Sequence, residues 1–141
     1  MRRRGLGIFG LTLIAVIALA LIPLETAIVP AWHITVLDEH GMPYVGQRVD
    51  EFWANYDLEL GVQHGEERWT NEFGRIDFPS RSLKMSAIER IIRRILAKVN
   101  RYLHGSKGVE AYLMTTVPEG IKTLQYESNK PPPDRWILPR H

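Results

Sequence analysis

The chain has 141 residues, with 18 lysines and arginines against 16 aspartates and glutamates. This length favours one domain, and the ordinary balance of apolar and charged residues excludes whole-chain disorder and a fibrous repeat. The sequence contains no cysteine, which excludes disulfides, cysteine-based metal sites and a thiol nucleophile. Composition therefore indicates a globular domain, and it points to no particular activity.

The amino terminus has the pattern of a membrane anchor. Three arginines at positions 2–4 precede the uncharged stretch 5–24, and the first charge after it is Glu25. About eighteen residues of helix span about 27 Å, close to the hydrocarbon thickness of a bilayer. Because flanking arginines are retained in the cytoplasm, the sequence predicts a single-pass anchor with a cytoplasmic amino terminus.

A cleaved signal peptide is the alternative interpretation. Residues 18–20, Ala-Leu-Ala, offer a small-residue cleavage site. The apolar stretch continues beyond that site, which favours an uncleaved anchor. Both interpretations place the following domain outside the cytoplasm, in the periplasm or the extracellular space.

Short strands are expected in most of the remaining chain, from β-branched and alternating apolar residues bounded by turn signals. The predicted strands are residues 32–37, 47–56, 67–70, 75–78, 109–117 and 121–127. Residues 61–65 are predicted as a loop or a short hairpin connection. The strands 67–70 and 75–78 are expected to form a hairpin in which Gly74 takes a positive φ, and Pro79 ends the second of them.

One helix is predicted at residues 86–103. Ser86 and Glu89 have the spacing of a capping box, and Gly105 supplies a stop. Apolar residues recur at i, i+3 and i+4 spacing along one face. They are Ile88, Ile91, Ile92, Ile95, Leu96, Val99, Tyr102 and Leu103.

Two segments carry a family resemblance. Residues 36–49 have an apolar strand, Asp38, Gly41 and Pro43 before Gly46, and residues 69–79 contain Thr-Asn entering a glycine turn. Together they resemble carboxypeptidase regulatory-like domains, over residues 32–80 mainly. The resemblance implies an immunoglobulin/transthyretin-like β-sandwich, and such domains typically bind or stabilise other molecules and are not catalytic.

The face of the helix opposite its apolar residues is a candidate lipid or partner face. Its members are Arg90, Arg93, Arg94, Lys98 and Arg101. They belong to a basic block, residues 81–107, with eight bases and one acid, which follows the acidic block 31–80 with ten acids and three bases. Three interpretations stay open: the apolar face covers the sandwich while the bases face water or the acidic strands, the helix lies on the membrane, or it binds a protein.

No catalytic, cofactor-binding or metal-binding residue is predicted. The five histidines, at positions 33, 40, 64, 104 and 141, lack the close spacing of a metal site. His64 beside Glu66 and Glu67 is expected in a solvated loop. Nucleophile-elbow, phosphate-loop and dinucleotide motifs are missing from the sequence, so the protein is not expected to be an enzyme.

The expected organisation is an anchor or signal peptide at 1–25, a linker at 26–31, a β-sandwich with its inserted helix at 32–128, and a proline-rich tail at 129–141 whose Trp136 is expected to be buried. The chain is expected to be a non-catalytic binding or structural module of the cell envelope, with the membrane and an envelope protein as partners and no nucleic acid. A membrane-peripheral lipid-binding module is the first alternative, and a small metal-dependent or hydrolytic enzyme is the second. The sequence leaves the oligomeric state open.

Overall fold

The structure is a computed structural model of the chain. It describes residues 2–60, 62–105, 108–128 and 130–139, and the side chains of residues 2–9, 100, 103 and 104 also lie outside the description. Leu103 of the predicted apolar face, the basic residue Lys107, and the histidines at 104 and 141 are therefore outside the described side chains. In chain order the elements are α1 (Arg2–Leu21), β1 (Pro23–Val29), β2 (Trp32–Leu37), β3 (Arg48–Asn55), β4 (Gln63–Trp69), β5 (Arg75–Phe78), β6 (Arg81–Ser86), α2 (Ala87–His104), β7 (Val109–Val117), β8 (Gly120–Gln125) and β9 (Arg135–Ile137).

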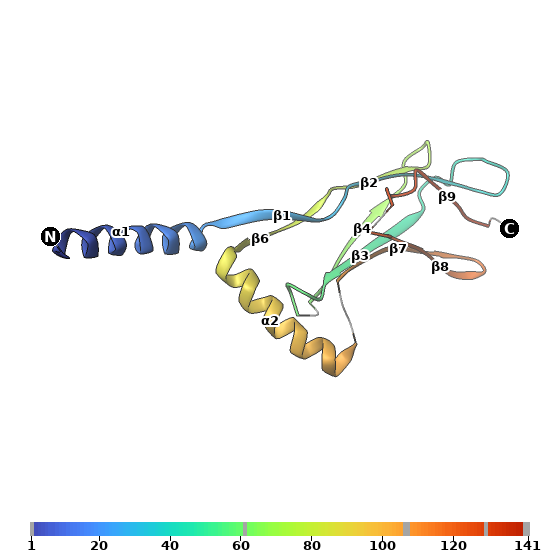
Figure 1. The fold of residues 1–141 in the computed structure, drawn as a ribbon. Coiled ribbons are helices and arrows are strands. Elements are labelled where there is room, and N and C mark those ends of the chain that lie inside the picture. Colours follow the sequence, from blue (N-terminus) through green and yellow to red (C-terminus); the bar gives the residue numbers. More distant parts are fainter. Residues whose placement is uncertain (1, 61, 106–107, 129, 140–141) are drawn as a thin grey trace.

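Two sheets pack on one hydrophobic core (Figure 1). One sheet has the strand order β5-β2-β9 and the other β4-β3-β7-β8. In β2, Trp32, Ile34 and Val36 are buried at alternate positions, as the two-residue period of a strand requires. They meet Phe78 and Leu113 in the core, where each buried side chain contributes about 1.5–3 kcal/mol. The prediction of a mainly β domain is confirmed, and a sandwich describes the two sheets loosely.

Most predicted strands are present with small changes at their ends. β2, β3, β5, β7 and β8 lie at the predicted positions. The connection predicted at 61–65 does join two paired strands, β3 and β4, but it ends earlier than predicted because β4 begins at Gln63. The sequence predicted only the end of β4, from residue 67, because the polar residues 63–66 give no strand signal. Their pairing with β3 supplies the missing support.

The hairpin predicted around Gly74 is wrong. The tight turn exists, with the Gly74 amide donating to Asn71 O over 2.9 Å and a φ of 70° at Gly74. The strands on either side, however, belong to different sheets, since β4 pairs with β3 while β5 pairs with β2. The turn therefore carries the chain from one sheet to the other. The local sequence of the turn determines that the chain reverses its direction. It does not determine with which strands β4 and β5 pair.

The predicted linker at 26–31 is mostly strand. Pro23–Val29 forms β1, which pairs antiparallel with β6 in a two-stranded ribbon. The predicted anchor boundary at 25 also falls inside β1, because α1 ends at Leu21. β6 was not predicted, since its sequence lacks β-branched residues and it is held by pairing with β1.

Helix α2 begins and ends as predicted. The Ser86 hydroxyl accepts from the Glu89 amide over 3.2 Å, and the Ser86 amide donates to the Glu89 carboxylate over 3.4 Å. At the other end Gly105 adopts the left-handed conformation, and its amide donates to Arg101 O over 2.9 Å. The capping box and the glycine stop therefore define the helix.

The carboxyl-terminal segment returns to the core. β9 pairs in parallel with β2, with Trp136 opposite Val36. Trp136 and Leu138 are buried in the core. The expectation that the tail runs over the domain and buries Trp136 is confirmed.

Helix α1 projects away from the sheets (Figure 1). Of its described side chains, from Gly10 onwards, Leu11, Ile14 and Leu19 are among the exposed large apolar groups. No helix within the described residues combines the length and the apolarity of a membrane span.

Candidate functional site

The candidate lipid or partner face of α2 lies against the domain, and three of its five predicted members bond to it. Arg90 Nη2 donates to Leu24 O over 2.5 Å, and Arg93 Nη1 donates to Leu58 O over 3.0 Å. Arg101 forms a 2.5 Å ion pair with Asp57. These contacts join α2 to β1 and to the turn that follows β3.

The other two predicted residues have different surroundings. Arg94 borders a cavity of about 240 Å³ between β1, the turn at 57–58 and α2. Lys98 is exposed. Between the bonded arginines, Ala97 is 4% exposed, so a small side chain brings the middle of the helix close to the domain.

The apolar face of α2 points away from the domain. Ile91 is 60% exposed, Ile95 58% and Tyr102 93%. The expectation that the isoleucine face covers the sandwich is therefore wrong. Two backbone carbonyl oxygens and a carboxylate of the domain pair with the guanidinium groups of α2, and these bonds turn the arginine face toward the domain. The core between the sheets is filled without α2.

We call the outward-facing residues the α2 stripe. It consists of Ile88, Ile91, Ile92, Ile95, Leu96, Val99 and Tyr102, all exposed. A run of exposed apolar side chains along four turns is rare on a soluble domain and marks a surface that contacts lipid or another protein. Among the described residues this stripe is the strongest candidate for a functional surface.

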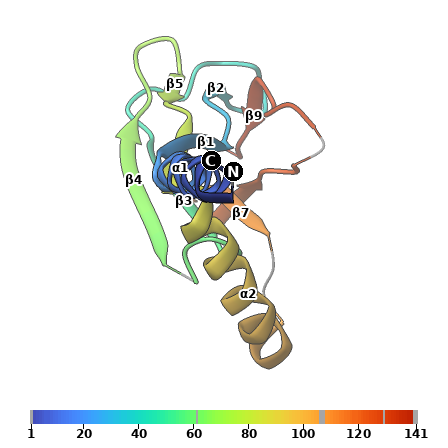
Figure 2. The same ribbon diagram turned by 60° about the vertical axis from the view of Figure 1, so that its left-hand side comes forward.

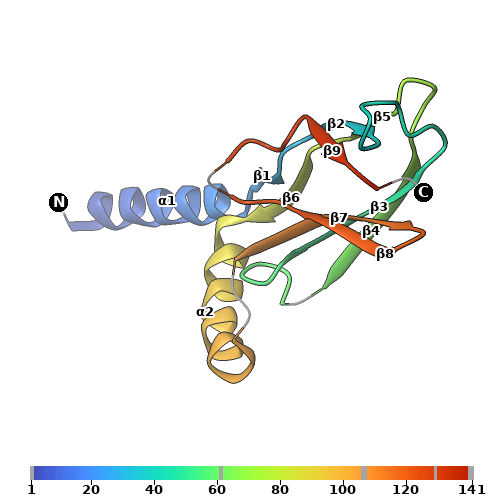
Figure 3. The same cartoon turned by 90° about the vertical axis from the view of Figure 1, so that its right-hand side faces the viewer.

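Helix α2 lies at the end of the domain from which α1 emerges (Figures 1 and 3). In the β1–β6 ribbon Pro23 pairs with Ser86. This register places the end of α1 next to the start of α2. Figure 2, which looks almost along α1, shows α2 extending sideways from that point.

A buried charged cluster lies beneath the same ribbon. Glu51 of β3 is fully buried, and Arg81 of β6 bonds to both Glu51 and Glu66. The guanidinium also lies 4.1 Å from the ring centre of Trp53. Arg81 is the first residue of β6, and it attaches this strand to the four-stranded sheet through its ion pairs and through its contact with the indole.

The two carboxyl groups of this cluster respond differently to their surroundings. Burial raises the pKa of Glu51, although the bonds from Arg81 oppose it. Burial also acts to raise the pKa of Glu66, but bonds from Arg81 and Arg68 outweigh it and lower that pKa. The cluster has the geometry of a structural contact, since its charges are bonded to one another.

His64 lies in β4 and not in the solvated loop expected for it. Its ring stacks on Trp53 with centres 5.3 Å apart, and its Nε2 lies 3.0 Å from Glu59 Oε1. In the described part of the chain, no group of three or more histidine and acidic side chains is placed to hold a metal ion.

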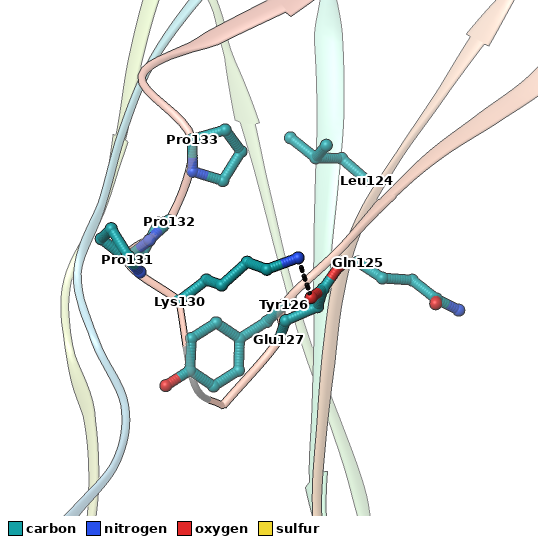
Figure 4. Close-up of a pocket in the computed structure, with 8 residues that line it drawn as sticks. All are labelled: Leu124, Gln125, Tyr126, Glu127, Lys130, Pro131, Pro132 and Pro133. Carbon is teal, nitrogen blue, oxygen red and sulfur yellow. Dashed lines mark ion pairs between the residues drawn. The ribbon is translucent and has the colours of Figure 1, made fainter.

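The tail forms one side of an open pocket (Figure 4). Residues 124–127 and 130–133 enclose about 220 Å³, with the three prolines on the side of the tail and Leu124 on the side of β8. Lys130 and Glu127 form an exposed ion pair of 2.6 Å at its rim. Among the described residues that line the pocket, the one acid and the one base are therefore paired with each other, and the rest are apolar, aromatic or amide side chains.

No family model, no curated protein and no solved structure matches this chain. Sequence reasoning found the arginines and isoleucines of α2, but it missed the carbonyl oxygens of Leu24 and Leu58 that bond two of those arginines. It also missed the cluster of Glu51, Glu66 and Arg81. A glutamate at an inward position of β3, between Val49 and Trp53, was the one signal for that cluster.

Proposed function

We propose that this chain is a membrane-anchored module that displays a non-catalytic binding or structural domain outside the cytoplasm. The observation that carries the proposal is α1, whose described apolar side chains are exposed and lack cover from the β domain. An exposed apolar helix in water is unfavourable by about 25 cal/mol for each Å² of its surface. A bilayer removes that cost.

The sequence around α1 supports the orientation. Arginines at positions 2–4 lie at its amino-terminal end, and Glu25 is the first charge beyond its carboxyl-terminal end. With the arginines in the cytoplasm, β1 and everything after it lie on the other side of the membrane. The location would then be the cell membrane, with the β domain in the periplasm or the extracellular space.

For the β domain we propose an immunoglobulin/transthyretin-like sandwich of the carboxypeptidase regulatory-like kind. Support comes from the way its two motifs meet. Thr70 Oγ1 accepts from the Gln47 amide over 2.8 Å and donates to Tyr44 O over 2.5 Å, and the Val36 amide donates to Gly74 O over 2.8 Å. The two segments that carry the resemblance thus form one bonded unit.

Membrane insertion of the full chain tests the anchor. The full chain, expressed in a bacterial host, should remain in the membrane fraction after an alkaline wash, with residues 31–139 open to protease added from outside the inner membrane. Replacing Ile14 and Ile17 by aspartate should release it, since each central charge costs about 2.5–3.5 kcal/mol on insertion. The matched control is Ile121→Asp, at an exposed isoleucine of β8. Release of the unchanged chain by the wash would contradict the anchor, and a mature mass shortened after residue 20 would show a signal peptide.

The exposed α2 stripe favours a second candidate function, that of a membrane-peripheral module that binds lipid through α2. This function differs from simple anchoring because it assigns the membrane contact to the domain itself. This second function is tested separately, by measuring whether α2 contacts lipid when α1 is already inserted in the membrane.

A further inference from the structure

Building on the proposed anchor, we propose that α2 lies in the interface of the membrane that α1 crosses, with the α2 stripe inserted among the lipids and its arginine face turned toward the domain. The occupant of the stripe is therefore a lipid surface. The apolar face of α2 is inserted as in other interfacial helices, but its arginines bond to the domain and not to the headgroups.

The β1–β6 ribbon places the start of α2 close to the membrane that contains α1. Because Pro23 pairs with Ser86, a bilayer that contains α1 must have its outer surface near the first turn of α2. From there α2 extends sideways when viewed along α1 (Figure 2). Figure 1 shows that α2 also slopes away from the end of α1, so that its first turns lie nearest to the membrane surface.

The contacts of α2 with the domain fix which face meets the lipid. Arg90, Arg93 and Arg101 bond to Leu24 O, Leu58 O and Asp57. These bonds hold the opposite face, with Ile91 and Ile95, away from the sheets. Rotation of the stripe onto the domain would break all three, so the stripe is held outward before any lipid is bound.

Charge favours lipid over a second copy of the chain. Glu89 is the one acidic residue of α2, and it is bonded to the helix cap. A second α2 would therefore bring another Lys98 and no unpaired carboxylate to such a contact. Anionic headgroups, by contrast, would attract the exposed Lys98 of α2 and the exposed Lys84 of β6, whose ion pair with Glu25 is 4.0 Å long.

The test uses the full chain, in nanodiscs of phosphatidylcholine and phosphatidylglycerol. Because the chain has no cysteine, a single cysteine gives a unique site for an environment-sensitive fluorophore. Three variants are compared: Ile95→Cys in the α2 stripe, Ile14→Cys in α1, and the matched control Ile121→Cys in β8. Nanodiscs with brominated acyl chains report direct contact between the fluorophore and lipid.

We expect brominated lipid to quench the fluorophores at positions 14 and 95 several-fold more than that at 121. Quenching at 14 with none at 95 would overturn the α2 proposal and leave the anchor intact. Quenching at neither position would overturn both. An apolar environment at 95 without quenching, together with energy transfer between differently labelled chains, would assign the stripe to a second copy and also overturn the proposal.

A charge variant gives an independent check. Ile91→Asp should leave the chain anchored, because α1 is unchanged, and should reduce quenching at position 95 several-fold. Ile137→Asp, at another exposed isoleucine, should change neither. Unchanged quenching at 95 in the Ile91→Asp variant would contradict insertion of the stripe.

Discussion

Pro23 and Ser86 are register partners at the end of the β1–β6 ribbon. Pro23 follows closely on the end of α1, and Ser86 is the cap of α2. The end of α1 and the beginning of α2, which are far apart in the sequence, therefore lie next to each other in the fold. This junction connects the membrane anchor that we propose to the exposed stripe of α2.

The exposed position of Ile92 predicts a small effect on stability. Ile92→Ala should lower the free energy of unfolding by less than about 0.5 kcal/mol, because the side chain is largely in solvent. Ile34→Ala, in the core, should cost about 2–5 kcal/mol. Urea unfolding of both variants in detergent checks the difference. A cost at Ile92 close to that at Ile34 would show that the stripe is packed in the folded domain.

The arginine face of α2, unlike the α2 stripe, is expected to contribute to the stability of the folded domain. Arg93→Ala removes the bond to Leu58 O and should cost about 1.5–3 kcal/mol, as expected for a hydrogen bond from a charged donor. Lys98→Ala, on the same helix and exposed, should change stability by less than about 0.5 kcal/mol. Hydrogen exchange should also become faster in α2 of the Arg93 variant only. Equal effects of the two substitutions would contradict docking through the arginines.

Gly74 is expected to be sensitive for two reasons. Its φ is 70°, and an added Cβ would lie 2.5 Å from Val36 O. Gly74→Ala should therefore cost clearly more than the roughly 1 kcal/mol that a positive φ alone imposes. Gly46→Ala is the matched control, because φ there is 66° with nothing within 4 Å of the added Cβ. Thermal unfolding that gave similar losses would refute the close approach of Gly74 to β2.

Glu51 predicts a pH dependence with a definite sign. Burial raises its pKa in the folded chain above the usual value of 4.5, so the folded state binds the proton more tightly than the unfolded state does. Its contribution to stability is present at low pH and declines as pH rises through the raised pKa. The Glu51→Gln side chain stays neutral, so this variant should gain stability relative to the unchanged chain between about pH 4 and pH 7. Urea unfolding across this range that showed the unchanged chain gaining on the variant would reverse the assigned sign.

The sequence correctly predicted those features of the fold that are determined by residues close together in the chain. The capping box of Ser86 and Glu89, the stop at Gly105 and the alternation of Trp32, Ile34 and Val36 each correspond to an observed element. The turn before Gly74 was also predicted correctly. In each case the signal lies within a few residues of the structure it specifies.

The rest depended on contacts between distant segments. An amphipathic helix has two faces, and its sequence alone does not say which one meets the domain. The bonds of the arginines to the carbonyl oxygens of Leu24 and Leu58 and to Asp57 decide which face it is, and these three residues come from segments far from α2 in the sequence. The same pairing changed a predicted linker into a strand, and the sheet partners of β4 and β5 changed a predicted hairpin into a crossing between sheets.

The measurement that tests the account most directly is a nitroxide scan along α2 in the full chain in nanodiscs. Single cysteines at successive positions from 91 to 99 are labelled, and collisions with oxygen, which concentrates in lipid, are compared with collisions with a water-soluble nickel complex. We predict a helical period, with the greatest depth at 91, 95 and 99 and the least near 93 and 97. Uniformly high collision rates with nickel, or a period whose deepest positions are 93 and 97, would contradict the account.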